Sequence, residues 1–389
     1  MRPEARVQAA IDCLDAILAG APAEKALTGW ARRARYAGSK DRAAVRTHVY
    51  DVLRRKRACT AAGGGGQARA LMLGLVRLQG GDVDALFSGG GYGPEALNTS
   101  ERAVLDQPLK AMGPEVPEWL LPRLKVRFGT DLEAELDPLA HRAPVFLRVN
   151  RRKTDPVSAV AQLVTDGIIA APFHLAENAL IVTEGARKVA QSAAYRDGLV
   201  ELQDAASQAA MEAVSLSDDL KILDYCAGGG GKILALAGRA TAGAGLFAHD
   251  ANPVRLRDLP ARAERAGVRV SLLQSDGLSE EAPFGVVLCD VPCSGSGTWA
   301  RDPDAKWRFS EADLKKLNTT QDAILDAAAP LVGQGGVLVY ATCSLLGDEN
   351  EARIAAFQQR NPGWVLAFSR QWAPSEGANG FFSAHLCRA

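Results

Sequence analysis

The sequence predicts an α/β protein in which a doubly wound, mostly parallel sheet follows a helical domain and a small α+β domain. Strand-like and helix-like segments alternate from about residue 215, which is typical of a sheet covered by helices on both faces. Residues 1–137 show apolar side chains at helical spacing and no strand-like alternation. The pattern changes near residue 143. We therefore expect domains over 1–137, 138–205 and 206–389.

The first domain is expected to contain only helices. A helix over 4–19 ends at Gly20, and four consecutive glycines from Gly63 stop a second one over 40–59. Asp12 and Asp15 interrupt the apolar stretch near the N-terminus, so it does not resemble a signal peptide. No run is long enough to span a bilayer, and we expect a soluble, cytoplasmic protein without membrane contact. Further helical segments are expected at 67–79, 101–111 and 117–128.

The remaining segments define the two sheets. In the small domain, strands at 145–150 and 179–185 flank a helix at 155–168. The larger domain is expected to have helices from Lys232 and at 252–266, 311–329 and 348–360. Its strands are expected at 221–226, 245–250, 268–276, 284–291, 335–344, 364–368 and 380–387. Parallel strands bind ligands beyond their carboxyl ends, so the site is expected at that edge.

Basic residues are concentrated in the first half of a chain whose formal net charge is zero. Residues 1–60 carry a net charge of +7 and residues 140–154 one of +5, so the remainder is acidic. A solvated helix face is one interpretation of such clusters, and contact with RNA phosphates is the other. The candidate phosphate contacts are Arg54, Arg55, Lys56, Arg57, Arg148, Arg151, Arg152 and Lys153.

The seven cysteines exclude a secreted disulfide scaffold. Their number is odd, and no CxxC pair or Cys/His cluster has the spacing of a zinc site. We therefore expect reduced thiols and no metal.

A glycine-rich turn, DYCAGGGGK (224–232), joins a strand to a helix and lets a ligand approach the backbone. It fits neither the P-loop nor the dinucleotide fingerprint, and a tight turn without ligand stays an alternative. Asp224, Asp250, Asp276 and Asp290 are expected at the ends of successive strands. Such a row of carboxylates repels a diphosphate but accepts a cationic nucleoside such as S-adenosylmethionine.

Two cysteines are expected beside Asp290 at the mouths of neighbouring strands. Cys293 lies in DVPCSGSG and Cys343 in VYATCS. A single cysteine of this kind is usually a small buried hydrophobe, whereas two at adjacent strand ends indicate a reactive pair. No Cys–His protease motif and no GxSxG elbow accompanies them.

These motifs resemble those of the Sun/Fmu-type family of bacterial ribosomal RNA cytosine-C5 methyltransferases, which use S-adenosylmethionine. DYCAGGGGK is similar to D-x-C-A-A-P-G-G-K, DVPCSGSG to D-A-P-C-S-G-x-G, RDPDAKWR to R-x-P-D-x-K-W-x, and ATCSLLGDENE to T-C-S-x-x-x-x-E-N-E. QDAAS (203–207) and NGFFSAHLCR near the end also match. The chain departs from this pattern at Gly228 and Gly229, which replace Ala-Pro, at Ile233, which replaces Thr, and at Val291, which replaces Ala.

The resemblance implies a fold and a set of roles. It implies a NusB-like RNA-binding domain, an RRM-like small domain and a Rossmann-like methyltransferase domain. By resemblance, Cys343 adds to cytosine C6, Cys293 assists product release and Asp290 binds the cytosine N3/amino edge. The implied cofactor site comprises Cys226, Ala227, Gly228, Gly229, Gly230, Gly231, Lys232, Asp250, Arg255, Asp276 and Asp290.

The implied substrate is small-subunit ribosomal RNA, methylated by a monomer before or during subunit assembly. The target base must leave its stack, and Trp299, Trp307 and Tyr340 are candidates to stack on it, with core burial equally open. A transfer-RNA methyltransferase with the same chemistry is one alternative. A non-catalytic RNA-binding assembly factor is another, against which the presence of both Cys293 and Cys343 argues.

Overall fold

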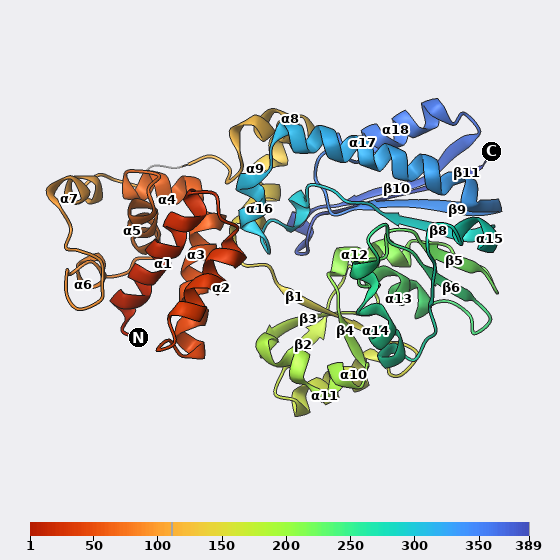
Figure 1. Ribbon diagram of the computed structural model, residues 1–389, viewed down its shortest axis with the longest axis horizontal. Coiled ribbons are helices and arrows are strands. Elements are labelled where there is room, and N and C mark those ends of the chain that lie inside the picture. Colours follow the sequence, from red (N-terminus) through yellow and green to blue (C-terminus); the bar gives the residue numbers. More distant parts are fainter. Residues whose placement is uncertain (110–111, 389) are drawn as a thin grey trace. The chain divides into compact units, whose positions relative to one another are not determined.

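The computed structural model describes residues 1–109 and 112–388, and its contacts divide the chain into two compact units (Figure 1). Unit 1 comprises Met1–Arg142 and Trp299–Arg308, and unit 2 comprises Ala143–Thr298 and Phe309–Ala389. The short segment 299–308 thus packs with the helical part of the chain, which the boundaries drawn from the sequence did not anticipate. No helix in the described ranges is long and apolar enough to cross a membrane.

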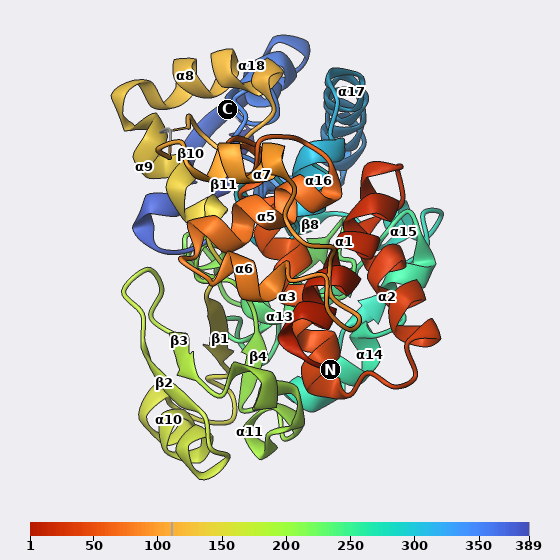
Figure 2. The same ribbon diagram turned by 90° about the vertical axis from the view of Figure 1, so that its left-hand side faces the viewer.

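The regular structure in the described residues of unit 1 is helical and includes no strand, as predicted, and loops connect the helices. The predicted helix over 40–59 is two helices, because Arg55 leaves the helical conformation at φ −118° and ψ 37°. Helices α1, α3 and α5 pack against one another and bury Leu14, Val49 and Leu71 (Figure 2). Positions 110 and 111 of the predicted helix at 101–111 lie outside the described residues. The helices are α1 (Pro3–Leu18), α2 (Ala23–Arg33), α3 (Ser39–Arg54), α4 (Lys56–Gly63), α5 (Ala68–Leu78), α6 (Val83–Leu86), α7 (Thr99–Leu105), α8 (Leu121–Phe128), α9 (Leu132–Leu136) and α16 (Pro303–Arg308).

Segment 299–308 is bound into unit 1 by hydrogen bonds as well as by packing. Arg54 Nε donates to a carbonyl of this segment at 2.8 Å, and the ammonium of Lys306 donates back to the Arg54 carbonyl at 3.0 Å. Trp307 Nε1 donates to the Leu53 carbonyl at 2.6 Å. Burial lowers the pKa of Lys306 to about 7.

The small domain of unit 2 is a four-stranded antiparallel sheet in the order β2-β3-β1-β4. The predicted strand at 145–150 is β1, and the one at 179–185 is β3. The sequence reading missed β2 and β4, which are only four and three residues long. Strands β1 and β2, which flank α10 in the chain, are separated by β3 in the sheet, so β1, α10 and β2 form a split βαβ unit. The elements are β1 (Val145–Val149), α10 (Pro156–Thr165), β2 (Ile169–Pro172), β3 (Ala179–Glu184), α11 (Ala193–Arg196) and β4 (Val200–Leu202).

The larger sheet has the order β10-β11-β9-β8-β5-β6-β7, with β11 antiparallel to β9 and β10. This confirms the predicted doubly wound fold. The strands are β5 (Lys221–Asp224), β6 (Gly245–Ala248), β7 (Ser271–Leu272), β8 (Phe284–Asp290), β9 (Val332–Thr342), β10 (Trp364–Trp372) and β11 (Phe381–Arg388). The helices are α12 (Ala205–Glu212), α13 (Gly231–Ala237), α14 (Leu259–Ala266), α15 (Leu278–Glu281), α17 (Glu311–Ala328) and α18 (Glu351–Arg360).

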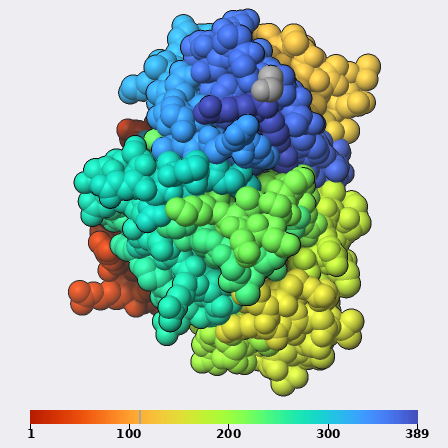
Figure 3. Space-filling view, turned by 90° about the vertical axis from the view of Figure 1, so that its right-hand side faces the viewer, coloured from red at the N-terminus to blue at the C-terminus, as the bar shows by residue number. Residues whose placement is uncertain are grey.

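Both faces of this sheet are apolar because alternate strand residues point to opposite sides. Val286 and Leu288 of β8 pack into the cluster that contains α12, α13 and α14. Val287 and Cys289 pack into the cluster that contains α17 and α18. Figure 3 shows the face of unit 2 on which the small domain, in yellow and yellow-green, borders the green and teal atoms of the larger domain.

Candidate active site

The sheet brings the two predicted reactive cysteines together. Strands β8 and β9 are parallel neighbours, and Asp290 at the end of β8 is in register with Ala341 near the end of β9. Cys293 and Cys343 follow these strand ends, and their sulfur atoms lie 3.4 Å apart. The Gly297 amide donates to the Cys343 carbonyl at 2.9 Å and links the two loops directly. The expected reactive pair is therefore present in space.

The two thiols differ in acidity. The hydrogen bond from Cys293 lowers the pKa of Cys343, although burial and Asp290 oppose the thiolate there. The same hydrogen bond, together with burial, raises the pKa of Cys293. Of the two, Cys343 therefore ionises more readily, and its thiolate is the expected nucleophile.

Lys232 supplies a positive charge beside this pair. Its ammonium donates to Asp290 Oδ2 at 2.5 Å and lies 5.1 Å from the centre of the Phe381 ring. Burial disfavours the ammonium, but Asp290 outweighs this effect and raises the pKa of Lys232. The positive charge of Lys232 also lowers the pKa of Cys343. One oxygen of Asp290, Oδ2, is thus used to hold Lys232.

A buried carboxylate behind the cysteines ties both loops together. Glu349 Oε1 accepts from the Ser294 amide at 2.8 Å and from Gln321 Nε2 at 3.0 Å. Its Oε2 accepts from the hydroxyls of Ser294 and Ser344, each at 2.5 Å. Ser294 and Ser344 follow Cys293 and Cys343 directly, so Glu349 holds the residue next to each thiol. The motif ATCSLLGDENE contains Glu349 but predicts no role for it, because sequence spacing does not reveal that two loops share a buried partner.

The glycine-rich turn follows β5 and begins α13. Gly228 and Gly230 have φ values of 51° and 80°, a left-handed conformation that favours glycine. A Cβ at position 230 would lie 2.1 Å from the Leu259 side chain, so that position also needs glycine for space. The Gly228 amide donates to Asp250 Oδ2 at 3.0 Å, which connects the turn to the next strand.

Three of the four predicted carboxylates lie at the strand ends. Asp224 ends β5, Asp290 ends β8 and Asp250 follows β6 by two residues. Burial and the charge of Asp290 raise the pKa of Asp224 to about 7. The prediction that Asp276 ends a strand is wrong, because β7 ends at Leu272 and Asp276 is an exposed residue of the following loop. Arg255 pairs with Asp250 Oδ2 at 3.0 Å.

This edge fits a cationic nucleoside cofactor. Asp224 Oδ1 is buried without a hydrogen-bond partner among the described residues, and Asp250 and Asp290 lie at neighbouring strand ends. Three carboxyl groups with two paired cations, Lys232 and Arg255, beside an open backbone turn suit a ligand with a positive centre and hydroxyl donors. Nowhere in the described ranges, this edge included, are three His, Cys, Asp or Glu side chains grouped as a metal site requires.

None of the three candidate stacking residues is free to stack on a base. Tyr340 is fully buried, and its hydroxyl donates to the Glu349 carbonyl at 2.5 Å. Trp299 is buried, and Trp307 is held by its bond to Leu53. The alternative of core burial is therefore correct for Tyr340 and Trp299, whereas Trp307 is half-buried with Lys56 and Lys306 against its ring. Cys289 is fully buried in the sheet core, whereas Cys226 is half-buried next to β5.

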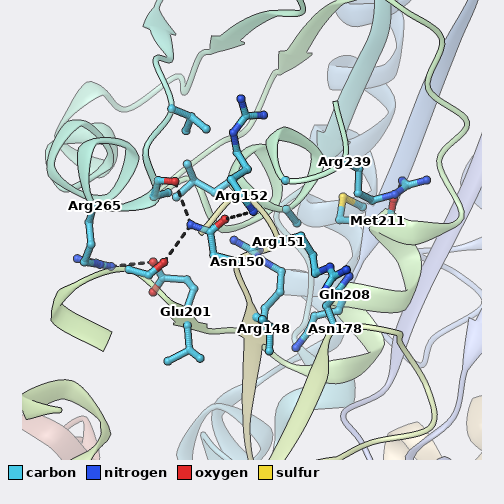
Figure 4. A pocket seen from close by; sticks show the side chains of 18 of the residues that line it. Arg148, Asn150, Arg151, Arg152, Asn178, Glu201, Gln208, Met211, Arg239 and Arg265 are labelled. Carbon is cyan, nitrogen blue, oxygen red and sulfur yellow. Dashed lines mark hydrogen bonds and ion pairs between the residues drawn. The ribbon is translucent and has the colours of Figure 1, made fainter. Parts of the chain in front are cut away.

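Several basic residues proposed to contact RNA instead hold backbone carbonyls of unit 2. Arg148 Nη1 donates to the Gly231 carbonyl at 2.8 Å, and burial lowers the pKa of Arg148 to about 10. Arg152 donates to the Ala237 carbonyl at the end of α13 at 3.1 Å, and Lys153 to that of Asp197 at 2.8 Å. Cations suit such carbonyl-rich helix ends. Figure 4 shows Arg148, Arg151 and Arg152 around the pocket beside β1.

The predicted RNA contacts at the end of α3 and the start of α4 are also largely engaged within the protein. Arg54 is buried and bonded to segment 299–308 and to Asp51, so it does not face a ligand. Lys56 lies 5.3 Å from the Trp307 ring centre, Arg57 pairs with Glu118 at 3.4 Å, and Arg55 is half-buried. The predicted RNA contacts did not include the basic residues around the turn between α2 and α3. We call the exposed basic side chains in and beside this turn the basic turn: Arg32 and Arg33 at the end of α2, Arg35 in the turn itself, and Lys40 and Arg42 at the start of α3.

Comparisons with known proteins identify the family of this chain. Residues 211–386 match the family described as 16S rRNA methyltransferase RsmB/F, and residues 116–189 match the ferredoxin-like domain of RsmF/B-like methyltransferases. Ribosomal RNA small subunit methyltransferase B of Citrobacter koseri is 34% identical over 70% of this chain and 66% of its own length. The protein of the same name from Xylella fastidiosa is 34% identical over 70% of this chain and 67% of its own length.

Solved structures show the same fold. The crystal structure of PH0851 covers all of this chain and 99% of its own, with a TM-score of 0.75 and 20% identity. The structure of NSun6 from Pyrococcus horikoshii with SFG covers 70% of this chain and 98% of its own, with a TM-score of 0.62 and 18% identity. The chain spans about two-thirds of the length of the curated relatives that it matches. By its motifs, its sheet and these relatives, the chain belongs to the RsmB/F family of 16S ribosomal RNA methyltransferases.

Proposed function

We propose that this chain methylates C5 of cytosine in small-subunit ribosomal RNA, with S-adenosylmethionine as the methyl donor. The observation that carries the proposal is the pair of cysteine sulfurs 3.4 Å apart, with the thiolate favoured on Cys343. C5 of cytosine is a poor nucleophile, and a thiolate that adds to C6 makes it enamine-like. The geometry beside Asp290 and Lys232 supports this reaction, and the family supports RNA as the substrate.

In the first step the Cys343 thiolate forms a bond to C6, and the π electron pair of the C5–C6 double bond shifts onto C5, which becomes nucleophilic. Asp290 Oδ1 accepts a hydrogen bond from the cytosine amino group, while Oδ2 stays with Lys232. The Lys232 ammonium offsets negative charge that develops on the base. When bound, the cofactor supplies an electrophilic methyl group on a sulfonium.

Release of the product needs a base. Once C5 carries the methyl group, its proton must leave so that the C5–C6 double bond re-forms and the bond between Cys343 and C6 breaks. The hydrogen bond to Cys343 raises the pKa of Cys293 more than any other interaction. This hydrogen bond is lost while Cys343 is bonded to carbon, so the pKa of Cys293 falls. Cys293 then loses its own proton to solvent more readily and accepts the C5 proton. The Cys343 thiolate is regenerated.

The turn 226–232, with Asp250 and Arg255, forms the proposed cofactor site, in which the open glycine backbone allows close approach. For RNA we propose contacts by the exposed Arg151 and by the basic turn. The buried or carbonyl-bound cations Arg54, Arg148 and Arg152 are left out of this surface.

Bisulfite mapping of ribosomal and transfer RNA from cells with the protein, without it, or with Cys343→Ala tests the proposal. We expect one or more 5-methylcytosines in small-subunit ribosomal RNA that disappear in both the deletion and the variant. Sites found only in transfer RNA would refute the ribosomal substrate. RNA and cofactor binding without any methylation would support a non-catalytic factor and contradict the proposal.

A further inference from the structure

Four consecutive glycines cannot hold the shape of the turn at 226–232 by themselves. Glycine loses more backbone freedom on ordering than any other residue, so a run of four is unusually mobile unless other groups hold it. Gly228 and Gly230 both need a left-handed backbone in the structure, which is a defined shape and not an average one. Groups outside the turn must therefore fix it.

Arg262 of α14 is one of these groups. Its Nη1 donates to the Gly229 carbonyl, in the middle of the glycine run. Its Nε faces the carboxylate of Glu201 at 3.5 Å, and Glu201 is buried on β4 of the small domain. Arg265, one helical turn further on, pairs with the same carboxylate at 2.7 Å (Figure 4). Arg262 is thus anchored on one side and bonded to the turn on the other.

A second carbonyl of the turn, that of Gly231, is also held by residues of the small domain and of the segment after it. The Gly231 carbonyl accepts from Arg148 of β1 at 2.8 Å and from Gln203 Nε2 at 3.2 Å. The small domain and the segment after it therefore donate hydrogen bonds to the Gly231 carbonyl. The small domain also provides Glu201, which holds Arg262 at the Gly229 carbonyl. A Cβ at position 229 would lie 2.9 Å from Arg262 Nη1, so the guanidinium occupies the space that a side chain would need.

We propose that Arg262, anchored by Glu201, is a positioning residue that holds the turn in the shape to which the cofactor binds. The inference rests on the proposed use of S-adenosylmethionine. Position 229 is a proline in the motif that this sequence otherwise resembles, and a proline restricts its own backbone. Here Arg262 supplies from outside the restraint that the glycine run lacks.

The test compares Arg262→Met with Arg265→Met as a matched control. Both changes remove a guanidinium that pairs with Glu201 from the same helix, but only Arg262 contacts the turn. Hydrogen exchange of amides 226–232 is measured on the cofactor-free protein, and S-adenosylhomocysteine affinity by calorimetry. A hydrogen bond from a charged donor accounts for about a tenfold change in an equilibrium constant. We therefore expect about tenfold faster exchange and about tenfold weaker binding in Arg262→Met only.

Arg262→Lys is expected to recover part of both effects, because an ammonium can still donate to the Gly229 carbonyl. Unchanged exchange in Arg262→Met, or an equal change in Arg265→Met, would overturn the inference. If the unaltered protein binds no S-adenosylhomocysteine, the proposed function is refuted, and the exchange comparison still decides whether Arg262 holds the turn.

Discussion

Replacement of Glu349 by Gln should both destabilise unit 2 and slow the reaction. The four bonds to this side chain come from two loops and from Gln321 of α17. An amide nitrogen in place of Oε2 leaves the hydroxyls of Ser294 and Ser344 without their acceptor. At about 1.5 kcal/mol for each bond to a charged group, the loss is about 3 kcal/mol in the free energy of unfolding. The two serines adjoin Cys293 and Cys343, so the thiols should also separate.

Urea denaturation followed by tryptophan fluorescence measures the stability, and single-turnover methylation measures the rate. We expect a lower unfolding free energy and a lower rate, with RNA affinity unchanged. The exposed Glu280 on α15 gives a matched control, because Glu280→Gln changes the charge equally. A Glu349→Gln variant with unaltered stability and rate would refute the view that this carboxylate holds the two cysteine loops.

Three further predictions follow from charge and burial. Burial and the charge of Asp290 raise the pKa of Asp224 to about 7, so a bound cation favours its ionised form. Calorimetry should show affinity for S-adenosylmethionine rising from about pH 6 to about pH 8, and Asp224→Asn should abolish the rise. Burial lowers the pKa of Lys306 from 10.5 to about 7. Between pH 7 and pH 10.5 Lys306 is protonated in the unfolded chain but not in the folded one, so unit 1 should gain stability as the pH rises. An equal gain in Lys306→Met would contradict this. Replacing Arg32, Arg33 and Arg35 of the basic turn by Glu should lower the salt slope of RNA binding by roughly 0.7 to 0.9 for each lost contact, and an unchanged slope would exclude the turn.

The long helices and strands could be predicted from the sequence. The strand FGVVLCD and the helix after Ser310 carry clear apolar patterns, and both occur at the expected places. Strands β2 and β4 have four and three residues, which is too short for a pattern to emerge, and the strand expected at 268–276 is reduced to the two residues of β7. Segment 299–308 could not be assigned to unit 1 from its spacing, because its partners lie some 250 residues earlier in the chain.

The candidate site was predictable where chemistry is carried by residue type. Cys293, Cys343 and Asp290 were expected at neighbouring strand ends, and they are found there. The arginine clusters gave wrong predictions, because the sequence does not distinguish a cation exposed to solvent from one that binds a backbone carbonyl of its own chain. Arg148 looked like a phosphate contact and instead holds the Gly231 carbonyl. Glu349 was overlooked as a partner of both loops, because its partners become visible only when they meet in space.

The central claim is that Cys343 forms a covalent bond to the cytosine that Cys293 helps to break. The most direct measurement incubates the Cys293→Ala protein with small-subunit ribosomal RNA and S-adenosylmethionine, followed by a denaturing gel and mass analysis of the RNA-linked peptide. We predict a denaturation-resistant RNA–protein band whose linked peptide contains Cys343, and no such band when Cys343→Ala is added. Absence of the band in Cys293→Ala, or linkage through another residue, would contradict the account.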